Sequence, residues 1–306
     1  MSVTVFGSAN ADLTVHVRRS PDAGETVTGT GFTVGLGGKG LNQAVAAARF
    51  GAPTSFVGRV GDDDYADMLA AGLAQAGVDV GDLARSPGSA SGVALVVLAD
   101  DGENRIVVVP GANGNVGGAD LTRLCARLDG GGVLLVQLEL PLPVVVAAVA
   151  AASERGVRVV LDPAPSPEGD LPQALYAPHV VLTPNEGEAA ALVGHPLRDD
   201  GDAERAARAL LGRGVGAVVL KLGERGVCWA EGDEVAWQPA LPVEVRDTVG
   251  AGDAVNGVLA AALDAGMSLR EALTWAVGAG SVAVTRSGAC AAMPTRAEVL
   301  ALLAPA

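Results

Sequence analysis

The sequence is poor in cysteine. Its 306 residues include only three, Cys125, Cys228 and Cys290, an odd number at wide spacing. Such a set forms neither a disulfide framework nor a zinc signature, so we interpret these cysteines as core thiols of a protein from the reducing cytoplasm. The three histidines are equally scattered and show no metal-ligand spacing.

Aromatic residues and positive charge are also scarce. Aromatic side chains make up 3% of the chain, whereas aliphatic residues and glycine are frequent, which is typical of an α/β protein packed with Val, Ala and Leu. Lysine and arginine number 21 against 35 acidic residues, which gives a net charge of -14, and they form no basic stripe. This charge argues against a nucleic-acid partner.

Long apolar runs are missing as well. The longest, Val144 to Ala152, is much shorter than the roughly 20 residues that a membrane-spanning helix needs. The start of the chain has no basic region followed by a long apolar segment, so we expect no signal peptide. These absences lead us to expect a cytoplasmic protein with no membrane partner.

What the sequence does contain is an alternation of apolar strand patterns and Ala-rich helical patterns. The expected strands are Val3 to Phe6, Ser55 to Val60, Val133 to Leu138, Arg158 to Leu161, His179 to Thr183 and Ala217 to Lys221. The expected helices are Leu41 to Phe50, Tyr65 to Ala76, Pro143 to Glu154, Ala203 to Arg213 and Gly252 to Leu263. This rhythm predicts an α/β fold with a three-layer, doubly wound, mostly parallel sheet.

Two segments, Leu13 to Val34 and Gly92 to Pro110, interrupt this rhythm and have the pattern of antiparallel strands exposed on one face. In the second, Asp100-Asp101-Gly102 lies between two β-rich runs, which is a strong hairpin signal. We therefore predict a small β lid at residues 13–35 and 91–111, inserted into a core of residues 1–12, 36–90 and 112–306.

The stretch Asp247 to Asp253 runs directly into the apolar helical pattern Ala254 to Leu263. The first N–H groups of a helix lack partners and carry partial positive charge, so glycines at this point form a cradle for an anion. Asp253 beside such a cradle can accept a proton from an attacking hydroxyl. The alternative is a tight strand-to-helix turn in which Asp253 only caps the helix.

A second glycine cluster, Gly35 to Gly40, formally matches G-x-G-x-x-G. A dinucleotide site also needs an acidic residue at the end of the next strand, and Ser55 to Val60 ends in Arg59 and Val60. A Walker loop is excluded because Thr33 stands at its first glycine and Gly40 at its hydroxyl position. There remains a glycine turn with Lys39 and Asn42, which either binds a hydroxylated ligand or is purely structural.

Three further polar residues have positions that favour ligand binding. Asn10 and Asp12 alternate around Ala11 and so point to one face of an extended segment, or else they belong to an Asx-rich turn. Glu139 follows the apolar strand Leu134 to Leu138, and ligands of open α/β sheets bind at the carboxyl ends of strands. A solvated face is the alternative for Glu139.

Taken together, these segments resemble the signatures of one family, the ribokinase-like (PfkB) carbohydrate kinases, across almost the whole chain. Gly7 to Asp12 resembles the first sugar-binding turn of the family. Gly24 to Val27 with Gly37 to Ala44 resembles its first signature, and Asp247 to Gly257 resembles its second. The resemblance implies a ribokinase-like fold and the ATP-dependent phosphorylation of D-ribose at its 5-hydroxyl.

The resemblance also implies roles for individual residues. Sugar-binding roles fall on Asn10, Asp12, Gly38, Lys39, Asn42, Glu139 and Asp253. Asp253 is the implied general base, and the implied anion hole consists of the N–H groups of Gly250, Ala251, Gly252 and Asp253. Carboxylates and amides form paired hydrogen bonds with vicinal hydroxyls, which agrees with a sugar ligand.

For the phosphate donor, the resemblance implies nucleotide contacts from Asn185, Lys221, Gly223, Glu224, Arg225, Gly226 and Gly252. Asn185 and Glu188 resemble the N-x-x-E element of the family near Mg²⁺, which they would contact through water. Taken without the resemblance, Asn185 and Glu188 fit a helix cap, and Lys221 fits a surface lysine at a strand end.

A monovalent cation is also implied. The residues that resemble the K⁺ site of the family are Asp247, Val249, Ala283, Arg286 and Gly288. The chain departs from the family pattern at two positions: Ala292 replaces a frequent serine and removes one possible oxygen ligand, and Val277 replaces a frequent polar residue near the nucleotide.

Three alternatives stay open from the sequence. The first is a kinase of the same family for 2-deoxyribose, fructose or adenosine, which would carry the same motifs. The second is a non-catalytic sugar-binding regulator, and the third is a dehydrogenase. Asp253 and the cradle are intact, which speaks against the regulator. We also expect a homodimer through the lid, because its uncovered edge and apolar face need a partner.

Overall fold

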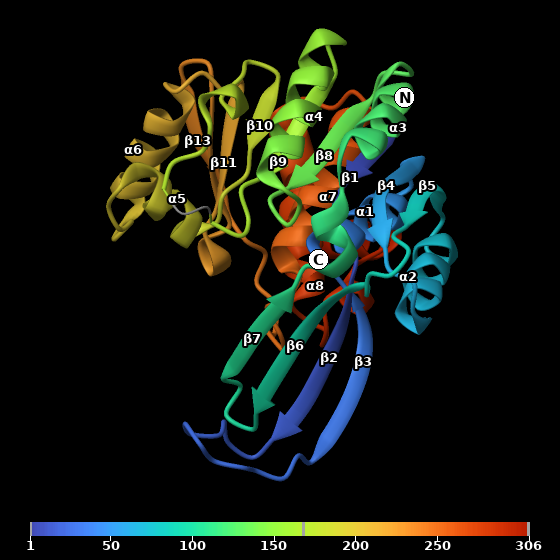
Figure 1. Cartoon of the computed structure of the whole chain (residues 1–306). Coiled ribbons are helices and arrows are strands. Elements are labelled where there is room, and N and C mark those ends of the chain that lie inside the picture. The colour runs from blue at the N-terminus through green and yellow to red at the C-terminus, as the bar shows by residue number, and fades with distance from the viewer. Residues whose placement is uncertain (1, 167–168, 305–306) are drawn as a thin grey trace.

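The computed structural model describes residues 2–166 and 169–304 and has a nine-stranded sheet as its centre (Figure 1). The strand order is β13 (Glu234–Gln238), β12 (Val227–Glu231), β11 (Ala217–Lys221), β10 (Val180–Leu182), β9 (Arg158–Asp162), β8 (Val133–Gln137), β1 (Val3–Phe6), β4 (Thr54–Val60) and β5 (Val78–Arg85). Strands β11 to β5 in this order are parallel, and β12 and β13 add an antiparallel edge.

Helices cover both faces of the sheet. On one face lie α1 (Lys39–Phe50), α2 (Asp64–Gln75), α7 (Ala251–Asp264), α8 (Leu269–Ala283) and α9 (Arg296–Leu303). On the other lie α3 (Gly118–Leu128), α4 (Leu142–Glu154), α5 (Glu186–Val193) and α6 (Asp200–Leu211). Along β8, Val133 and Leu135 pack into the first core while Leu134 and Val136 pack into the second. This alternation, with both faces buried, explains the continuous apolar run and confirms the predicted three-layer fold.

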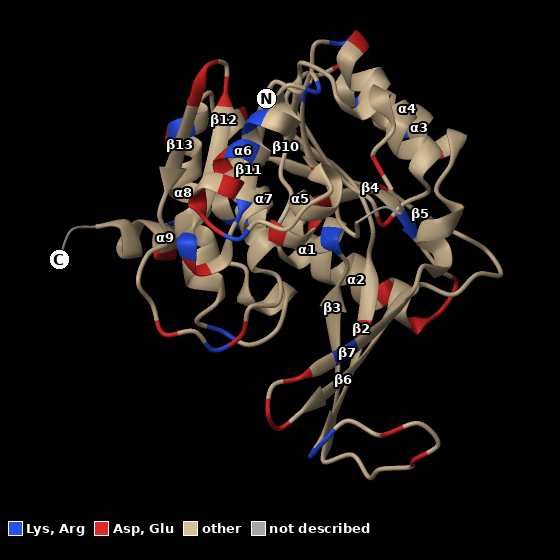
Figure 2. Cartoon of the chain, turned by 90° about the vertical axis from the view of Figure 1, so that its left-hand side faces the viewer, with Lys and Arg blue, Asp and Glu red and all other residues tan. Residues whose placement is uncertain are grey.

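Four strands form a separate sheet that projects from the body (Figures 1 and 2). Their order is β3 (Gly31–Gly37), β2 (Asn10–Val17), β6 (Gly92–Ala99) and β7 (Asn104–Val109), with β6 and β7 joined around Asp100–Gly102 as a hairpin. The expected lid segment began at residue 13, whereas the β2 ladder already begins where Asn10 pairs with Gly37. The first polar turn is therefore part of the lid.

The order in which successive strands are added to the main sheet reverses at β1. From β1 the order runs through β4 to β5 on one side, and through β8, β9, β10 and β11 on the other. Both lid segments leave the body near this switch point, where open α/β sheets bind ligands at the carboxyl ends of their strands. Short 3-10 helices, η1 (Gly111–Asn115), η2 (Gln173–Leu175), η3 (Gly223–Arg225) and η4 (Cys290–Ala292), occur in the loops. No helix within the described ranges is long and apolar enough to cross a membrane.

Candidate active site

The residues of the predicted anion cradle lie at the N-terminus of α7. Gly250 caps the helix with φ of 76°, a left-handed conformation that favours glycine. The first helical hydrogen bond runs from the Ala254 N–H to the Gly250 carbonyl at 2.9 Å, and the Ala251 N–H donates to the Thr248 carbonyl at 3.3 Å. Within residues 2–166 and 169–304, the N–H groups of Gly252 and Asp253 have no backbone acceptor. They are therefore free to bind an anion.

Asp253 lies in the first turn of α7 and is 6% exposed. Its Oδ2 accepts a hydrogen bond from Asn42 Nδ2 and its Oδ1 accepts one from Gln43 Nε2, both at 2.9 Å. Helices α1 and α7 approach so closely here that a Cβ on Gly257 would lie 2.4 Å from the Gln43 carbonyl oxygen. Only glycine fits at this position. Burial raises the pKa of Asp253, Lys39 opposes this shift, and Asp162 adds to it. Such a carboxylate is a stronger base than an exposed one.

Asp12 on the lid strand β2 and Glu139 after β8 are the two further carboxylates of the predicted site. Burial, reinforced by the charges of Glu139 and Asp253, raises the pKa of Asp12 to about 7. Asp12 Oδ1 is buried and has no hydrogen-bond partner among the described residues, so it is available to a ligand. Glu139 Oε2 accepts hydrogen bonds from Ser8 Oγ at 2.5 Å and from the Lys39 N–H at 3.1 Å. Gly38 caps α1 directly before Lys39.

Asn10 is 3% exposed, and its side chain is held by a residue that the sequence analysis did not single out. Asn113 Nδ2 donates to Asn10 Oδ1 at 2.8 Å, and Asn113 Oδ1 accepts from the Ala9 N–H at 3.0 Å. Asn113 therefore fixes the turn before β2. Asn42 Oδ1, by contrast, is buried without a partner in the described part of the chain.

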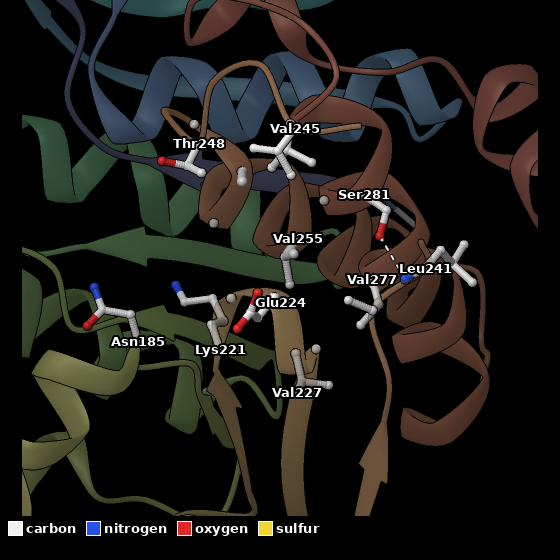
Figure 3. Close-up of a pocket in the computed structure, with 18 of the residues that line it drawn as sticks. Asn185, Lys221, Glu224, Val227, Leu241, Val245, Thr248, Val255, Val277 and Ser281 are labelled. Carbon is white, nitrogen blue, oxygen red and sulfur yellow. Dashed lines mark hydrogen bonds between the residues drawn. The ribbon is translucent and has the colours of Figure 1, made fainter. Parts of the chain in front are cut away.

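A cavity of about 890 Å³ extends from the cradle to the C-terminal half of α8. Its polar end contains Lys39, Asn185, Glu188, Lys221 and Gly250 to Asp253. Its other end is apolar, with side chains that include Val227, Leu241, Val245, Val255 and Val277 (Figure 3). Ser281 Oγ, also in this end, accepts a hydrogen bond from the Leu241 N–H at 3.2 Å. The cavity can therefore hold phosphates at one end and a flat apolar group at the other.

Asn185 and Glu188 form a helix cap and also line the cavity. The geometry therefore agrees with a structural cap and with a position beside the phosphates. Glu188 Oε2 accepts from the Asn185 N–H and Oε1 from Asn185 Nδ2, both at 2.7 Å. Burial raises the pKa of Glu188. The described residues contain no cluster of three or more acidic, His or Cys side chains able to hold a metal. This donor set fits a Mg²⁺ bound mainly by phosphates and water, with the protein in contact through water.

The loop after β11 contributes unevenly to the cavity. Gly223, Glu224 and Gly226 line it. Arg225 instead forms ion pairs with Glu186 at 3.0 Å and with Asp200 at 3.1 Å and does not line the cavity. Lys221 is not a surface residue, because 12% of its side chain is exposed.

The segment expected to hold a monovalent cation lies beside the cradle. Asp247 Oδ1 accepts a hydrogen bond from the Val249 N–H at 3.0 Å, and Oδ2 accepts one from the Gly288 N–H at 2.8 Å. Asp247 therefore links the two segments that are expected to hold the cation, residues 247–249 and 283–288. The Ala283 carbonyl already accepts the Arg286 N–H at 3.1 Å, and the Arg286 side chain pairs with Glu298. Ala292 is fully buried and adds no side-chain oxygen. A carboxylate with nearby carbonyls remains a donor set suited to a hard cation.

Comparisons with known proteins assign the family. The model of the pfkB family carbohydrate kinases matches residues 1–296. The chain is 37% identical to a ribokinase of Bacillus subtilis over 302 residues, 99% of each chain, and 34% identical to a deoxyribokinase of Salmonella typhi over 261 residues, 85% of each. The structure of Arabidopsis thaliana ribokinase complexed with ribose and ATP matches with a TM-score of 0.90 and 33% identity, over 100% of this chain and 99% of that one.

This protein is thus a carbohydrate kinase with the ribokinase-like α/β fold, and it belongs to the pfkB family. Both predictions, the fold and the kinase class, are confirmed. The dehydrogenase alternative is wrong: the glycine turn Gly35 to Gly40 ends a lid strand and begins α1 instead of following the first strand of a dinucleotide fold.

Proposed function

We propose that the protein transfers the γ-phosphoryl group of ATP to the 5-hydroxyl of D-ribose. One observation carries this proposal: Asp253 lines the cavity and also lies close enough to Asp12 to raise the pKa of that carboxyl. The base therefore stands between the donor cavity and the polar side chains of Asp12 and Glu139. The similarity to ribokinases, one of them complexed with ribose and ATP, supports this assignment of the two ligands.

In this proposal the sugar lies under the lid. Asp12, Asn42 and Glu139 accept or donate hydrogen bonds to its hydroxyls, and unpartnered oxygens on Asp12 and Asn42 are ready to do so. Ala94 and Val108 lie in register with Asp12 on the same face of the lid and cover the sugar's far side. Ribose would thus be shielded from water on several sides.

The chemical step has one proton transfer and one displacement. Asp253 accepts the proton of the 5-hydroxyl as that oxygen forms a bond to the γ-phosphorus, and the bond from phosphorus to the oxygen of the ADP leaving group breaks. The free N–H groups of Gly252 and Asp253 stabilise the negative charge on the transferring group. The Gly250 and Ala251 backbone completes the cradle, with Ala251 partly engaged by Thr248.

Two cations belong to the proposal. Mg²⁺, when bound, balances phosphate charge, and Asn185 and Glu188 would orient its water ligands. K⁺ would be held by Asp247 and by the carbonyls of Val249, Ala283, Arg286 and Gly288, next to the cradle. Because Ala292 offers no oxygen, we expect activation by K⁺ to be weaker than full coordination would give.

The proposed function is tested by ADP release from Mg-ATP with ribose, 2-deoxyribose, fructose or adenosine, each with and without K⁺. We expect the highest kcat/KM with ribose. The deoxyribokinase relative makes 2-deoxyribose the second candidate, and hydrogen bonds to a 2-hydroxyl would separate the two. A higher kcat/KM for another acceptor would refute the ribose assignment and keep the kinase, and no turnover with any of them would favour the non-catalytic regulator.

We further propose that two copies pair through the lid. The outer lid face, opposite Asp12, is formed by Leu13, Val15, Phe32, Val34, Leu95, Val97, Val107 and Val109, with Arg105 in register with Val97 as its one charged residue. Phe32 is 60% and Val107 61% exposed in the single chain. The lid strands are almost free of charge (Figure 2). An apolar sheet face of this kind, with its edges open, is stabilised by a second copy.

The replacement Leu95→Asp tests this pairing by placing a carboxylate in the centre of the outer lid face. We expect the wild type to sediment as two 30.3-kDa chains and the variant as one, because burying an unpaired charge is costly. Ile106→Asp is the matched control, since Ile106 is 51% exposed, against 45% for Leu95, but lies on the opposite face. A monomeric wild type, or a dimeric Leu95→Asp variant, would contradict the proposal.

A further inference from the structure

Asp162 is a buried carboxylate behind the active site that none of the assignments above uses. It ends β9 and lies in register with Gln137 of β8, at the carboxyl edge of the sheet. Its exposure is 0%, and it does not line the cavity. Lys39 and Lys221, which do line the cavity, both contact Asp162.

Both oxygens of Asp162 are engaged. Oδ1 accepts a hydrogen bond from Lys221 Nζ at 2.8 Å, and Oδ2 accepts one from Gln43 Nε2 at 2.9 Å. Lys39 Nζ lies 3.9 Å from Oδ2. Burial acts to raise the pKa of Asp162, but the two ammonium groups outweigh it and hold the pKa below its ordinary value. Asp162 is therefore ionised at neutral pH.

The ion pair with Asp162 sets the position of the Lys221 ammonium. Lys221 Nζ lies 3.6 Å from the point that a Cβ on Gly252 would occupy, beside the free N–H groups of the cradle. A lysine side chain at a strand end has several rotatable bonds, and an ion pair with a fixed carboxylate limits them. A charge held in place before the reaction stabilises a transition state without reorganisation.

Gln43 extends this arrangement to the base. Its Nε2 donates to Asp162 Oδ2 and to Asp253 Oδ1, both at 2.9 Å, and its Oε1 accepts from Gln137 Nε2 at 2.6 Å. The last contact fixes the orientation of the amide. Asp162 and Asp253 are thus held relative to each other by one side chain.

We propose that Asp162 is a positioning residue for phosphoryl transfer: it holds the Lys221 ammonium at the anion cradle and, through Gln43, aligns the Asp253 carboxylate. This inference rests on the proposed kinase function and adds a residue that touches neither ligand. It also gives the Asp162–Lys221 pair a role on the donor side of the site.

The test compares Asp162→Asn, Lys221→Met and the double variant. We expect each single change to lower kcat/KM for Mg-ATP on the order of 10²-fold, and the dissociation constant of ribose, from calorimetry, to change less than about 3-fold. Because both changes break the Asp162–Lys221 ion pair, their losses should not multiply, and the double variant should be about as active as the more impaired single variant. Removing both partners also avoids an unpaired buried lysine, so the double variant should fold.

Asp120→Asn is the matched control. Asp120 is also 0% exposed and pairs with two arginines, Arg59 and Arg123, but it lies on α3 away from the cavity. It should lower the melting temperature without changing kcat/KM for Mg-ATP per folded molecule. If Asp162→Asn behaves in the same way, the positioning role is refuted, and so it is if the losses of the two single variants multiply in the double variant.

Mg-ATP binding without sugar separates this inference from the proposed function. We expect Asp162→Asn and Lys221→Met to weaken that binding equally, by about 10-fold or more. A wild type that binds Mg-ATP but does not phosphorylate ribose would contradict the assigned acceptor, and the inference would still be decided by the binding measurement. Unchanged Mg-ATP affinity together with unchanged turnover in Asp162→Asn would overturn the inference itself.

Discussion

Replacing Asp253 with Asn is expected to lower kcat on the order of 10³-fold while ribose still binds. The amide cannot accept the proton of the 5-hydroxyl, whereas its shape matches the carboxylate. The pKa of Asp253 is raised by burial, so wild-type kcat should also fall as the pH drops through that raised value. The variant should lack this acidic limb. Steady-state ADP release across pH and calorimetry with ribose measure the two effects.

The structure indicates that this variant will fold. Gln43 can still donate to the remaining oxygen, and Asn42 can turn its unpartnered Oδ1 toward the new amide. Asp264→Asn is the matched control, because Asp264 lies in the last turn of the same helix, is 8% exposed, and has its pKa raised by burial. It should keep wild-type turnover. Near-normal kcat in Asp253→Asn would refute the assignment of the base.

Replacing Asp12 with Asn is expected to stabilise the protein at pH 8 and to impair ribose binding. Burial, Glu139 and Asp253 raise the pKa of Asp12 from 3.8 to about 7, so an ionised Asp12 lowers the stability of the ligand-free fold. We expect a gain of up to about 4 kcal/mol in the free energy of unfolding at pH 8. Loss of a charged hydrogen-bond partner should raise the KM for ribose about 10- to 100-fold.

The raised pKa of Asp12 determines how the stability difference between variant and wild type changes with pH. Between pH 4 and 7 the folded protein binds more protons at Asp12 than the unfolded chain does, so the contribution of Asp12 to stability decreases as the pH rises through this range. The difference between variant and wild type should therefore be small near pH 4 and largest above pH 7. Urea unfolding at several pH values measures it. A difference that does not change with pH would show that Asp12 is not the titrating group.

Much of the fold follows from local sequence patterns. The strand Ala217–Lys221 was predicted with its observed bounds, and the hairpin around Asp100–Gly102 was placed correctly, because apolar periodicity and turn residues act over a few positions. The patterns did not reveal β5, β12, β13, α3, α5, α8 or α9. Strand β5 and helix α5 have mixed or short patterns whose structure depends on packing against neighbours.

The candidate site divides in the same way. The helix start at Gly250 and the position of Asp253 in its first turn were predictable because the glycines and the helix start are adjacent in sequence, whereas their roles stay predictions. Asp162 was missed although the rule that selected Glu139, a polar residue at a strand's carboxyl end, applies to it as well; the predicted strand stopped one residue earlier, at Leu161. Asn113 lies in a short 3-10 helix and carried no signal at all.

The sequence alone determined the layered α/β architecture, the β lid, the kinase family and the residues adjacent to the two glycine motifs, because each of these depends on short-range periodicity or on contiguous motifs. Only the tertiary structure decided which distant side chains meet. Gln43 contacts Asp162 and Asp253, more than 100 residues away, because α1, α7 and β9 pack together. The pKa values of Asp12 and Asp253 likewise depend on burial and on charges from other elements, which no local pattern encodes.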